Sequence, residues 1–314
     1  MRERVLILRD QDLEHNETGL RERMLRSVDV ASSTCGTATE QKPERIFTLN
    51  GAIRPRIPID SGERQFWRIV NASPDLYADL QLSGGQFEIV ALDGMPLSYH
   101  DPQTSTRRVD HVLLPPAGRV EAIIVGPPSG AEATLSTRCV DTVPDGDANP
   151  AMVIADVGAP GDHSPIRTVA DSTGLLAHDE VGRKLDRGLE VGKPDFTVTF
   201  TEDKSGFYIN GKKFSMQDEP LARVRIGGLQ HWRIVNSTRE LHPFHIHQVH
   251  FLAYAENGIG STYPEWLDTV NVPYGGSVDL IMDFTDPLIR GMSLFHCHLL
   301  SHEDKGMMAK VQFE

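Results

Sequence analysis

Residues 295–308 read F-H-C-H-L-L-S-H-E-D-K-G-M-M, a stretch of fourteen positions with three histidines, one cysteine and two methionines. In an extended strand, successive side chains alternate between the two faces. His296 and His298 therefore share one face of such a strand, while Cys297 points to the other. We expect this tripeptide to contribute side chains to two clusters, one on each side of the strand.

The residues that follow indicate what one of these clusters binds. Cys297, His302 and Met307 offer a thiolate, an imidazole and a thioether. A blue copper site uses two histidines and one cysteine in a trigonal plane, with a weak axial methionine. The second histidine must come from another segment, and residues 241–247, L-H-P-F-H-I-H, offer it. His245 and His247 repeat the alternate spacing, which suits a second metal cluster beside the first.

Both segments resemble the C-terminal copper motifs of the multicopper oxidases, the family of laccases, bilirubin oxidases and cuprous oxidases. The family patterns H-P-x-H-x-H and H-C-H-x-x-x-H-x-x-x-x-M are matched without a gap. The resemblance implies a type 1 copper held by His242, Cys297 and His302, with Met307 axial. It also implies a type 2 copper held by His245, and a type 3 pair held by His247, His296 and His298.

The resemblance further implies an activity. Multicopper oxidases take single electrons from phenols, aromatic amines or metal ions and reduce dioxygen to water. Cys297, His296 and His298 would then form the electron path between the copper centres. Glu303 matches an acidic position that in related enzymes helps to deliver protons to oxygen. The expected partners are a small aromatic or metal-ion electron donor and dioxygen, and the expected location is periplasmic or extracellular.

Half of the expected cluster is missing from the sequence. The family builds its trinuclear cluster from eight histidines, and four of them come from H-x-H-G and H-x-H motifs in an N-terminal domain. Outside the two C-terminal segments neither motif occurs in this chain, which resembles domains two and three of a three-domain oxidase. We therefore expect a complete type 1 copper site, partial type 2 and type 3 sites, and a further chain or domain that supplies the other histidines. The alternatives are a single type 1 copper electron-transfer protein or an inactive copper-binding truncation.

An internal repeat predicts the domain organisation. The block W-R-I-V-N occurs at residues 67–71 and again at residues 232–236, a domain-sized separation. Both blocks lie in runs of alternating polar and apolar residues separated by turn signals, which is typical of β-sandwiches. The expected fold is all-β, with two cupredoxin-like Greek-key β-sandwich domains. Residues 1–157 would form a domain without copper ligands, residues 158–192 a linker, and residues 193–314 the copper-binding domain.

Alignment of the two repeats indicates why only the second would bind copper. Ala78, Gln81 and Ser83 fall on the three histidines of the H-P-F-H-I-H segment. Cys139 falls on Cys297, but its neighbours are Arg138 and Val140. The first repeat thus keeps the scaffold without the ligands.

Five further residues carry expectations of their own. Cys35 and Cys139 either pair in an oxidising compartment or stay as free thiols. Asp268 either hydrogen-bonds to a ligand histidine or is an ordinary strand-edge carboxylate. His250 has the opposite strand parity to His245 and is not expected to be a ligand, and His231 is expected at the surface.

Composition limits the remaining possibilities. A chain of 314 residues has room for about two domains. A content of 39% hydrophobic and 24% charged residues is typical of a globular protein. The net charge of −13 argues against nucleic acid as a partner. No apolar run approaches the ~20 residues of a membrane span, and the residues after Met1 do not resemble a signal peptide.

Overall fold

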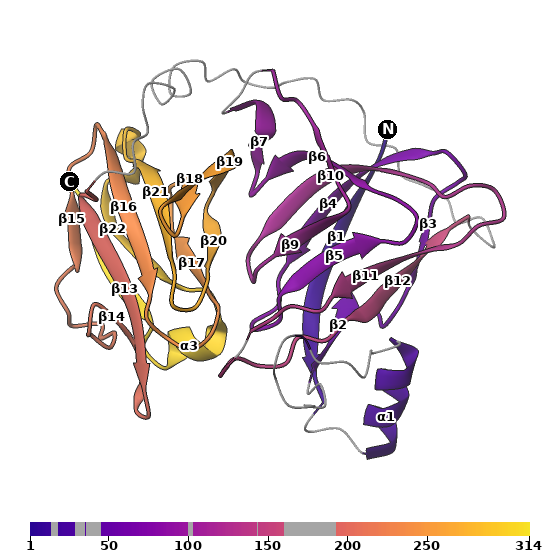
Figure 1. The fold of residues 1–314 in the computed structure, drawn as a ribbon, viewed down its shortest axis with the longest axis horizontal. Helices are drawn as coiled ribbons and strands as arrows, with labels where there is room; N and C mark the ends of the chain where they lie inside the picture. The colour runs from indigo at the N-terminus through magenta and orange to yellow at the C-terminus, as the bar shows by residue number, and fades with distance from the viewer. Residues whose placement is uncertain (14–17, 29–34, 36–44, 100–102, 143, 160–192) are drawn as a thin grey trace. The chain divides into compact units, whose positions relative to one another are not determined.

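The computed structural model describes residues 1–13, 18–28, 35, 45–99, 103–142, 144–159 and 193–314. These residues form two compact units, and the second unit comprises residues 144–146 together with the described residues from 193 onward. Figure 1 shows that both units are built almost entirely of strands, so the predicted all-β fold is confirmed. Most of the predicted linker lies outside the described residues, and the domain boundaries of the sequence analysis stay a prediction.

Two sheets form the N-terminal unit in the described part of the chain. The first has the strand order β2-β1-β4-β10-β6-β7, with β8 paired to β6. Its strands are β1 (Arg2–Asp12), β2 (Arg45–Leu49), β4 (Arg64–Asn71), β6 (Phe87–Leu92), β7 (Met95–Pro96), β8 (Arg107–Val109) and β10 (Arg119–Val125). The second has the order β3-β12-β11-β5-β9. Its strands are β3 (Arg56–Pro58), β5 (Ala78–Leu82), β9 (His111–Leu114), β11 (Ala133–Arg138) and β12 (Met152–Gly158).

The C-terminal unit repeats this arrangement over the residues that are described. One sheet has the order β14-β13-β16-β21-β18-β19. Its strands are β13 (Phe196–Asp203), β14 (Gly206–Ile209), β16 (Leu229–Asn236), β18 (Phe251–Glu256), β19 (Ile259–Leu267) and β21 (Ser277–Asp283). The other has the order β15-β23-β22-β17-β20. Its strands are β15 (Ala222–Val224), β17 (His242–Ile246), β20 (Thr269–Val272), β22 (Gly291–Cys297) and β23 (Met308–Phe313).

Short helical segments connect some of these strands. They are α1 (Thr18–Ser27), η1 (Leu97–Tyr99), η2 (Pro287–Ile289) and α3 (Leu300–Asp304). The sequence analysis did not predict α1 or α3. The helix that matters for the site is α3, because it lies inside the 295–308 stretch and lets the chain turn back between His298 and Met307.

The two W-R-I-V-N blocks occupy equivalent places. Trp67 on β4 and Trp232 on β16 are fully buried, because alternate residues of each strand face the core. Each indole donates a hydrogen bond to a glutamine two residues earlier, over 3.1 Å and 2.9 Å. The predicted repeat is therefore a repeat of structure, down to the hydrogen bond of its buried tryptophan.

The alignment of Cys139 with Cys297 is wrong by two residues. Cys297 lies opposite Phe244 in the pairing of β22 with β17. Thr137 takes this place in the N-terminal unit, opposite Leu80, and its hydroxyl accepts a hydrogen bond from the Asp79 backbone over 3.0 Å. Cys139 comes after the strand ends and forms a disulfide with Cys35, which settles the question of the two thiols.

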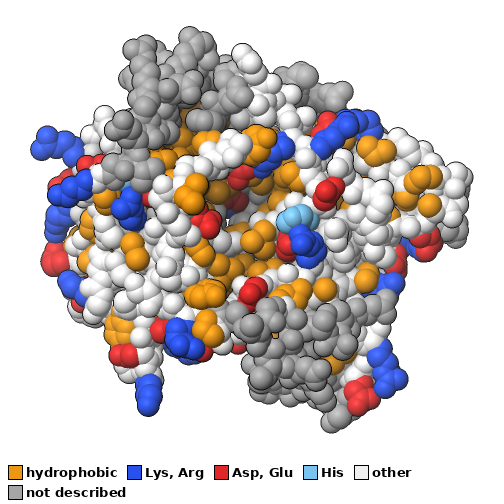
Figure 2. Space-filling view, viewed as in Figure 1, with side chains coloured by type: hydrophobic (Ala, Val, Ile, Leu, Met, Phe, Trp, Pro, Cys, Tyr) orange, Lys and Arg blue, Asp and Glu red, His pale blue; other side chains and the backbone are white. Residues whose placement is uncertain are grey.

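The surface carries both signs of charge. On the face shown in Figure 2, basic and acidic side chains are interspersed. Several form ion pairs, for example Arg68 with Glu121 on the neighbouring strand and Arg56 with Glu132. Pairs as exposed as these contribute little to stability. No described helix is long and apolar enough to cross a membrane.

Candidate metal centre

Strand β22 lies between β17 and β23 in the second sheet of the C-terminal unit. Its pairing with β17 sets Cys297 opposite Phe244 and His296 opposite His245. The alternation expected for the H-C-H tripeptide is present, because the cysteine contacts one set of histidines and its two neighbours contact another. Two clusters of metal-binding side chains therefore form on opposite sides of one sheet.

The first cluster consists of Cys297, His242 and His302. Cys297 Sγ lies 3.4 Å from His242 Nδ1 and 3.8 Å from His302 Nδ1, and the two nitrogens are 3.2 Å apart. All three residues are buried, so three donor atoms face one another with no room for solvent between them. Imidazole nitrogens and a thiol converge in this way where a metal ion binds.

The geometry of this triangle fits a copper ion. A triangle with sides of 3.2, 3.4 and 3.8 Å has its centre about 2 Å from each corner. Metal ions bind imidazole nitrogen at about 2.0–2.1 Å and thiolate sulfur at about 2.3 Å. Two imidazoles and one thiolate in a plane are the donors that copper takes in blue electron-transfer sites.

The turn through α3 brings the expected methionine to this cluster. The Cys297 backbone N–H donates to the Met307 carbonyl over 3.1 Å, and the Met307 N–H donates to the His302 carbonyl over 2.9 Å. The Leu299 N–H also donates to Cys297 Sγ over 3.5 Å. Met307 itself is fully buried. The backbone thus ties Met307 to both the cysteine and the histidine that the sequence placed beside it.

Other residues hold the far side of the two histidine rings. His302 Nε2 lies 3.3 Å from a Glu240 carboxylate oxygen, and its ring stacks on Phe207 with 3.9 Å between centroids. His242 Nε2 lies 2.8 Å from the Thr238 hydroxyl. The sequence analysis missed Thr238 and Glu240. Their one signal is their position, since both are polar residues in the short turn between the repeated W-R-I-V-N block and His242.

The second cluster lies on the other side of the sheet. Donor atoms of His245, His247 and His296 lie within 4.8 Å of one another, with the two Nε2 atoms of His247 and His296 separated by 3.2 Å. The ring of His298 is 5.2 Å from those of His245 and His296, centroid to centroid. The four histidines that the sequence assigned to type 2 and type 3 copper are thus neighbours, although His298 is not part of the three-residue group.

Backbone carbonyls fix the orientation of two of these rings. His245 Nδ1 lies 2.8 Å from the Asp268 carbonyl oxygen, and His296 Nδ1 lies 2.9 Å from that of Cys297. A carbonyl only accepts, so both Nδ1 atoms carry the hydrogen. Each ring consequently turns an unprotonated Nε2 towards the cluster, which is the form that binds metal.

Asp268 acts mainly through its backbone rather than through its side chain. Its carboxylate is 3.7 Å from His245 Nδ1, farther than its own carbonyl, and 3.9 Å from His250 Nε2. The reason is the pairing of β17 with β20, which sets the backbone around Thr269 opposite His245. His250 contacts this carboxylate and is not part of the three-histidine group.

Glu303 on α3 reaches the second cluster. One of its carboxylate oxygens lies 3.3 Å from His296 Nδ1. Partial burial raises the pKa of this carboxyl above its usual range. Glu303 therefore lies beside a ring of the cluster and holds a proton more readily than an exposed glutamate does.

Burial favours the neutral form of five of these histidines. It lowers the pKa of His245 and His302 to about 3 and that of His296 to about 4, and it also lowers the pKa of His242 and His298. The cause is the loss of hydration of the charged imidazolium in the interior. Metal ions bind neutral imidazole, so these five rings are in the binding form at neutral pH.

The expected surface position of His231 is wrong. Its side chain is only 12% exposed, and its Nε2 lies 2.7 Å from a carboxylate oxygen of the fully buried Asp279. Arg233 and Tyr254 complete this polar cluster, at 2.8 Å from Asp279 and 3.0 Å from His231. The alternation along β16 does turn His231 away from the core. On that side of the sheet, however, its ring contacts the side chains of Asp279 on β21 and Tyr254 on β18.

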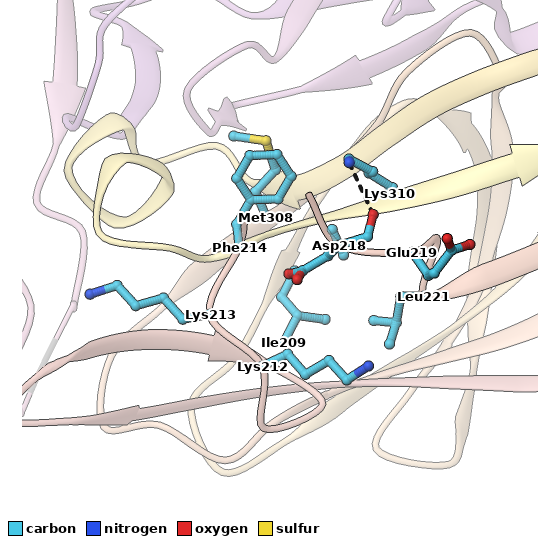
Figure 3. A pocket seen from close by; sticks show the side chains of 10 residues that line it. Ile209, Lys212, Lys213, Phe214, Asp218, Glu219, Leu221, Met308 and Lys310 are labelled. Atoms are coloured by element: carbon cyan, nitrogen blue, oxygen red, sulfur yellow. Dashed lines mark hydrogen bonds between the residues drawn. The ribbon is translucent and has the colours of Figure 1, made fainter. Parts of the chain in front are cut away.

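A small pocket lies next to β23 (Figure 3). It has a volume of about 20 Å³, enough for about one water molecule. Lys310 closes one side of it with a hydrogen bond to the Asp218 carbonyl over 3.0 Å. None of the predicted site residues lines this pocket.

Comparison with known proteins agrees with this geometry. Residues 191–314 match the family model described as multicopper oxidase. The chain is 26% identical to a laccase of Haloferax volcanii over 83% of its own length and 45% of that protein. It is 25% identical to the multicopper oxidase mco of Staphylococcus aureus, over 84% of this chain and 51% of the relative. The chain thus spans about half the length of the curated relatives that it matches.

Solved structures share the fold. A multicopper oxidase from Campylobacter jejuni, described as a metallo-oxidase, superposes with a TM-score of 0.69 at 20% sequence identity. The match covers 100% of this chain and 64% of that protein. At this level of identity the likeness concerns the fold.

Proposed function

We propose, because this chain belongs to the multicopper oxidase family, that it is part of a copper-dependent oxidoreductase. His242, Cys297, His302 and Met307 would hold a type 1 copper. The second cluster, His245, His247, His296 and His298, would supply half of the ligands of a trinuclear site. The activity would be the one-electron oxidation of phenolic, amine or metal-ion donors, coupled to the reduction of dioxygen to water.

One observation carries this proposal. Cys297 contributes its sulfur to the first cluster, while the residues on either side of it contribute their rings to the second. The two clusters are therefore joined by the covalent bonds of a single tripeptide. Such a connection serves electron transfer between two metal centres, and a protein that only stored metal would not need it.

The chain's own residues would each have a defined task. Copper at these donors supplies one-electron redox chemistry. The burial of Cys297 and His242 excludes water from the first cluster. His302 is held between Phe207 and Glu240, so its ring cannot turn away. Glu303, with its raised pKa and its place beside His296, would hold and release the protons that oxygen reduction consumes.

The second cluster requires histidines from elsewhere. His247 is exposed, and His245 is partly exposed, so the donors of this cluster are open to a further set of ligands. We infer that another domain or chain supplies the missing motifs. The donor molecule would be a small aromatic compound or a metal ion.

The disulfide supports an oxidising location. Cys35 and Cys139 are bonded, and such bonds persist mainly outside the cytosol. We therefore propose a periplasmic or extracellular site of action.

Copper stoichiometry and oxygen consumption test the function together. After copper loading and desalting in the presence of the domain or chain that supplies the missing histidines, about four copper ions per chain with oxygen uptake on a phenolic or ferrous donor would support the oxidase. About one copper ion with a blue colour and no oxygen uptake would favour a type 1 electron-transfer protein or an inactive copper-binding truncation. No tightly bound copper would contradict both. The Cys297→Ser variant controls for copper bound elsewhere.

A further inference from the structure

A buried hydrogen-bond network lies in the turn between β16 and β17. The side-chain nitrogen of Asn236 donates to the backbone carbonyls of Glu240 and Val272, over 2.8 Å and 3.0 Å. Since both partners are acceptors, the nitrogen and the oxygen of this amide are assigned without ambiguity. The Asn236 oxygen then accepts the Thr238 backbone N–H over 3.0 Å.

The Thr238 hydroxyl has a single hydrogen, and its neighbours decide where that hydrogen goes. The Asn236 side-chain oxygen lies 2.7 Å away, and the Glu240 carbonyl lies 3.2 Å away. Both can only accept, so the hydroxyl hydrogen points to one of them. His242 Nε2, at 2.8 Å, must therefore donate to the hydroxyl oxygen.

This assignment fixes the tautomer of His242. A neutral imidazole carries one hydrogen, and here it lies on Nε2. The unprotonated Nδ1 is the atom that faces Cys297 at 3.4 Å and His302 at 3.2 Å. The ring thus presents a lone pair to the first cluster through a chain of hydrogen bonds that begins at Asn236.

The N-terminal unit contains the same network without the histidine. Asn71 donates to the carbonyls of Leu76 and Leu114, over 2.8 Å and 3.0 Å, and its oxygen accepts the Ser73 N–H over 3.2 Å. Ala78 takes the place of His242. The Ser73 hydroxyl is buried and has no hydrogen-bond partner among the described residues. The asparagine contacts of this turn are thus present although the Ser73 hydroxyl takes no part in them.

We propose that Thr238 is a positioning residue, which with Asn236 holds His242 in the Nε2–H tautomer and so prepares Nδ1 for a metal ion before that ion binds. The inference rests on the proposed function in one respect, namely that the metal is copper. Partners of metal-bound histidines of this kind typically affect metal affinity by about 10- to 100-fold when they are removed. A matched comparison is available in the chain itself, because Ser73 provides a hydroxyl in the same turn with no ring to hold.

Nitrogen NMR of the metal-free chain with ¹⁵N-labelled histidine tests the proposal directly. The two ring nitrogens of a neutral histidine have distinct shifts, and the His242 signals are identified by their loss in His242→Gln. We expect the Nε2–H form in the unaltered chain and in Thr238→Ser. In Thr238→Val, which keeps the shape but removes the hydroxyl, we expect a mixture of tautomers and copper affinity about 10- to 100-fold lower. Ser73→Ala should change neither property.

The outcomes separate this proposal from the proposed function. An Nδ1–H form of His242 in the unaltered metal-free chain would overturn the proposed role of Thr238, even if copper binds. This result needs no variant, so it decides the matter also if Thr238→Val does not fold. Equal copper affinity in a folded Thr238→Val and in the unaltered chain would overturn it as well. The Nε2–H form in a chain that binds no copper would instead refute the copper function and leave the proposed role of Thr238 in place.

Discussion

Cys297 Sγ and His242 Nδ1 lie 3.4 Å apart, although 55 residues separate them in the chain. The pairing of β17 with β22 brings them together, since it sets Phe244 opposite Cys297, and His242 is the first residue of β17. The next residue of β22 towards its start, His296, faces the other side of the sheet and meets His245 and His247. A single step along the strand therefore moves from one cluster to the other.

Replacement of the cysteine should remove the blue colour of the copper-loaded protein. The colour of such sites depends on the bond between copper and a thiolate, and Cys297 is the cysteine that lies outside the disulfide. We expect Cys297→Ser to lose the intense visible absorption completely. Absorption spectra of the loaded variant and of the unaltered chain make the comparison. A variant that stays blue would contradict the assignment of Cys297.

Replacement of His296 should have the opposite pattern. His296 contacts His247 and Glu303 in the second cluster, on the other side of the sheet from the Cys297 sulfur. We expect His296→Gln to keep the blue absorption while any oxygen consumption falls by at least about 100-fold. An oxygen electrode measures the rate, and the absorption spectrum serves as the internal control for folding. Unchanged oxygen uptake would show that His296 has no part in the reaction.

The metal-free protein should lose stability in mild acid. Burial lowers the pKa of His245 and His302 from 6.5 to about 3, so between these pH values the unfolded chain binds protons that the folded chain does not. Stability is therefore greatest above pH 6.5 and falls as the pH decreases, by roughly 2 kcal/mol for each histidine at pH 5. Urea unfolding in the presence of a chelator measures this slope.

The His302→Gln variant provides the control for that measurement. It removes one of the two titrating rings, so its stability should fall less steeply over the same pH range. An equal slope in the variant and in the unaltered chain would mean that buried histidines are not the cause.

The disulfide should contribute to stability without affecting copper. The Cys35–Cys139 bond closes a loop of 104 residues in the N-terminal unit. Loss of a native disulfide typically costs about 2–5 kcal/mol, because the unfolded chain gains freedom. We expect the double variant Cys35→Ser, Cys139→Ser to unfold at lower denaturant concentration, as followed by tryptophan fluorescence. Its copper spectrum should match that of the unaltered chain. An altered spectrum would mean that the disulfide does influence the copper site.

Much of the site was predictable because its information is local. The alternation of H-C-H and H-x-H on strands depends on backbone geometry alone, and the structure places His245, His247 and His296 within one group. The alignment of the two repeats correctly placed Ala78, on β5, at the position that His242 takes on β17. It failed for Cys139, because a difference of two residues between the repeats cannot be seen without the strand pairing that sets Thr137 opposite Leu80.

The sequence by itself determined the two β-sandwich units and the two sets of candidate metal-binding residues, because strand periodicity and donor chemistry are properties of short segments. Only the tertiary structure decided which atoms face the metal. The tautomers of His242, His245 and His296 follow from a threonine hydroxyl and two backbone carbonyls, and strand pairing and turns bring these partners to the rings. The Cys35–Cys139 bond and the contact of Glu240 with His302 have the same origin. Each of these contacts joins residues that only folding brings together, so the spacing of residues along the chain does not predict it.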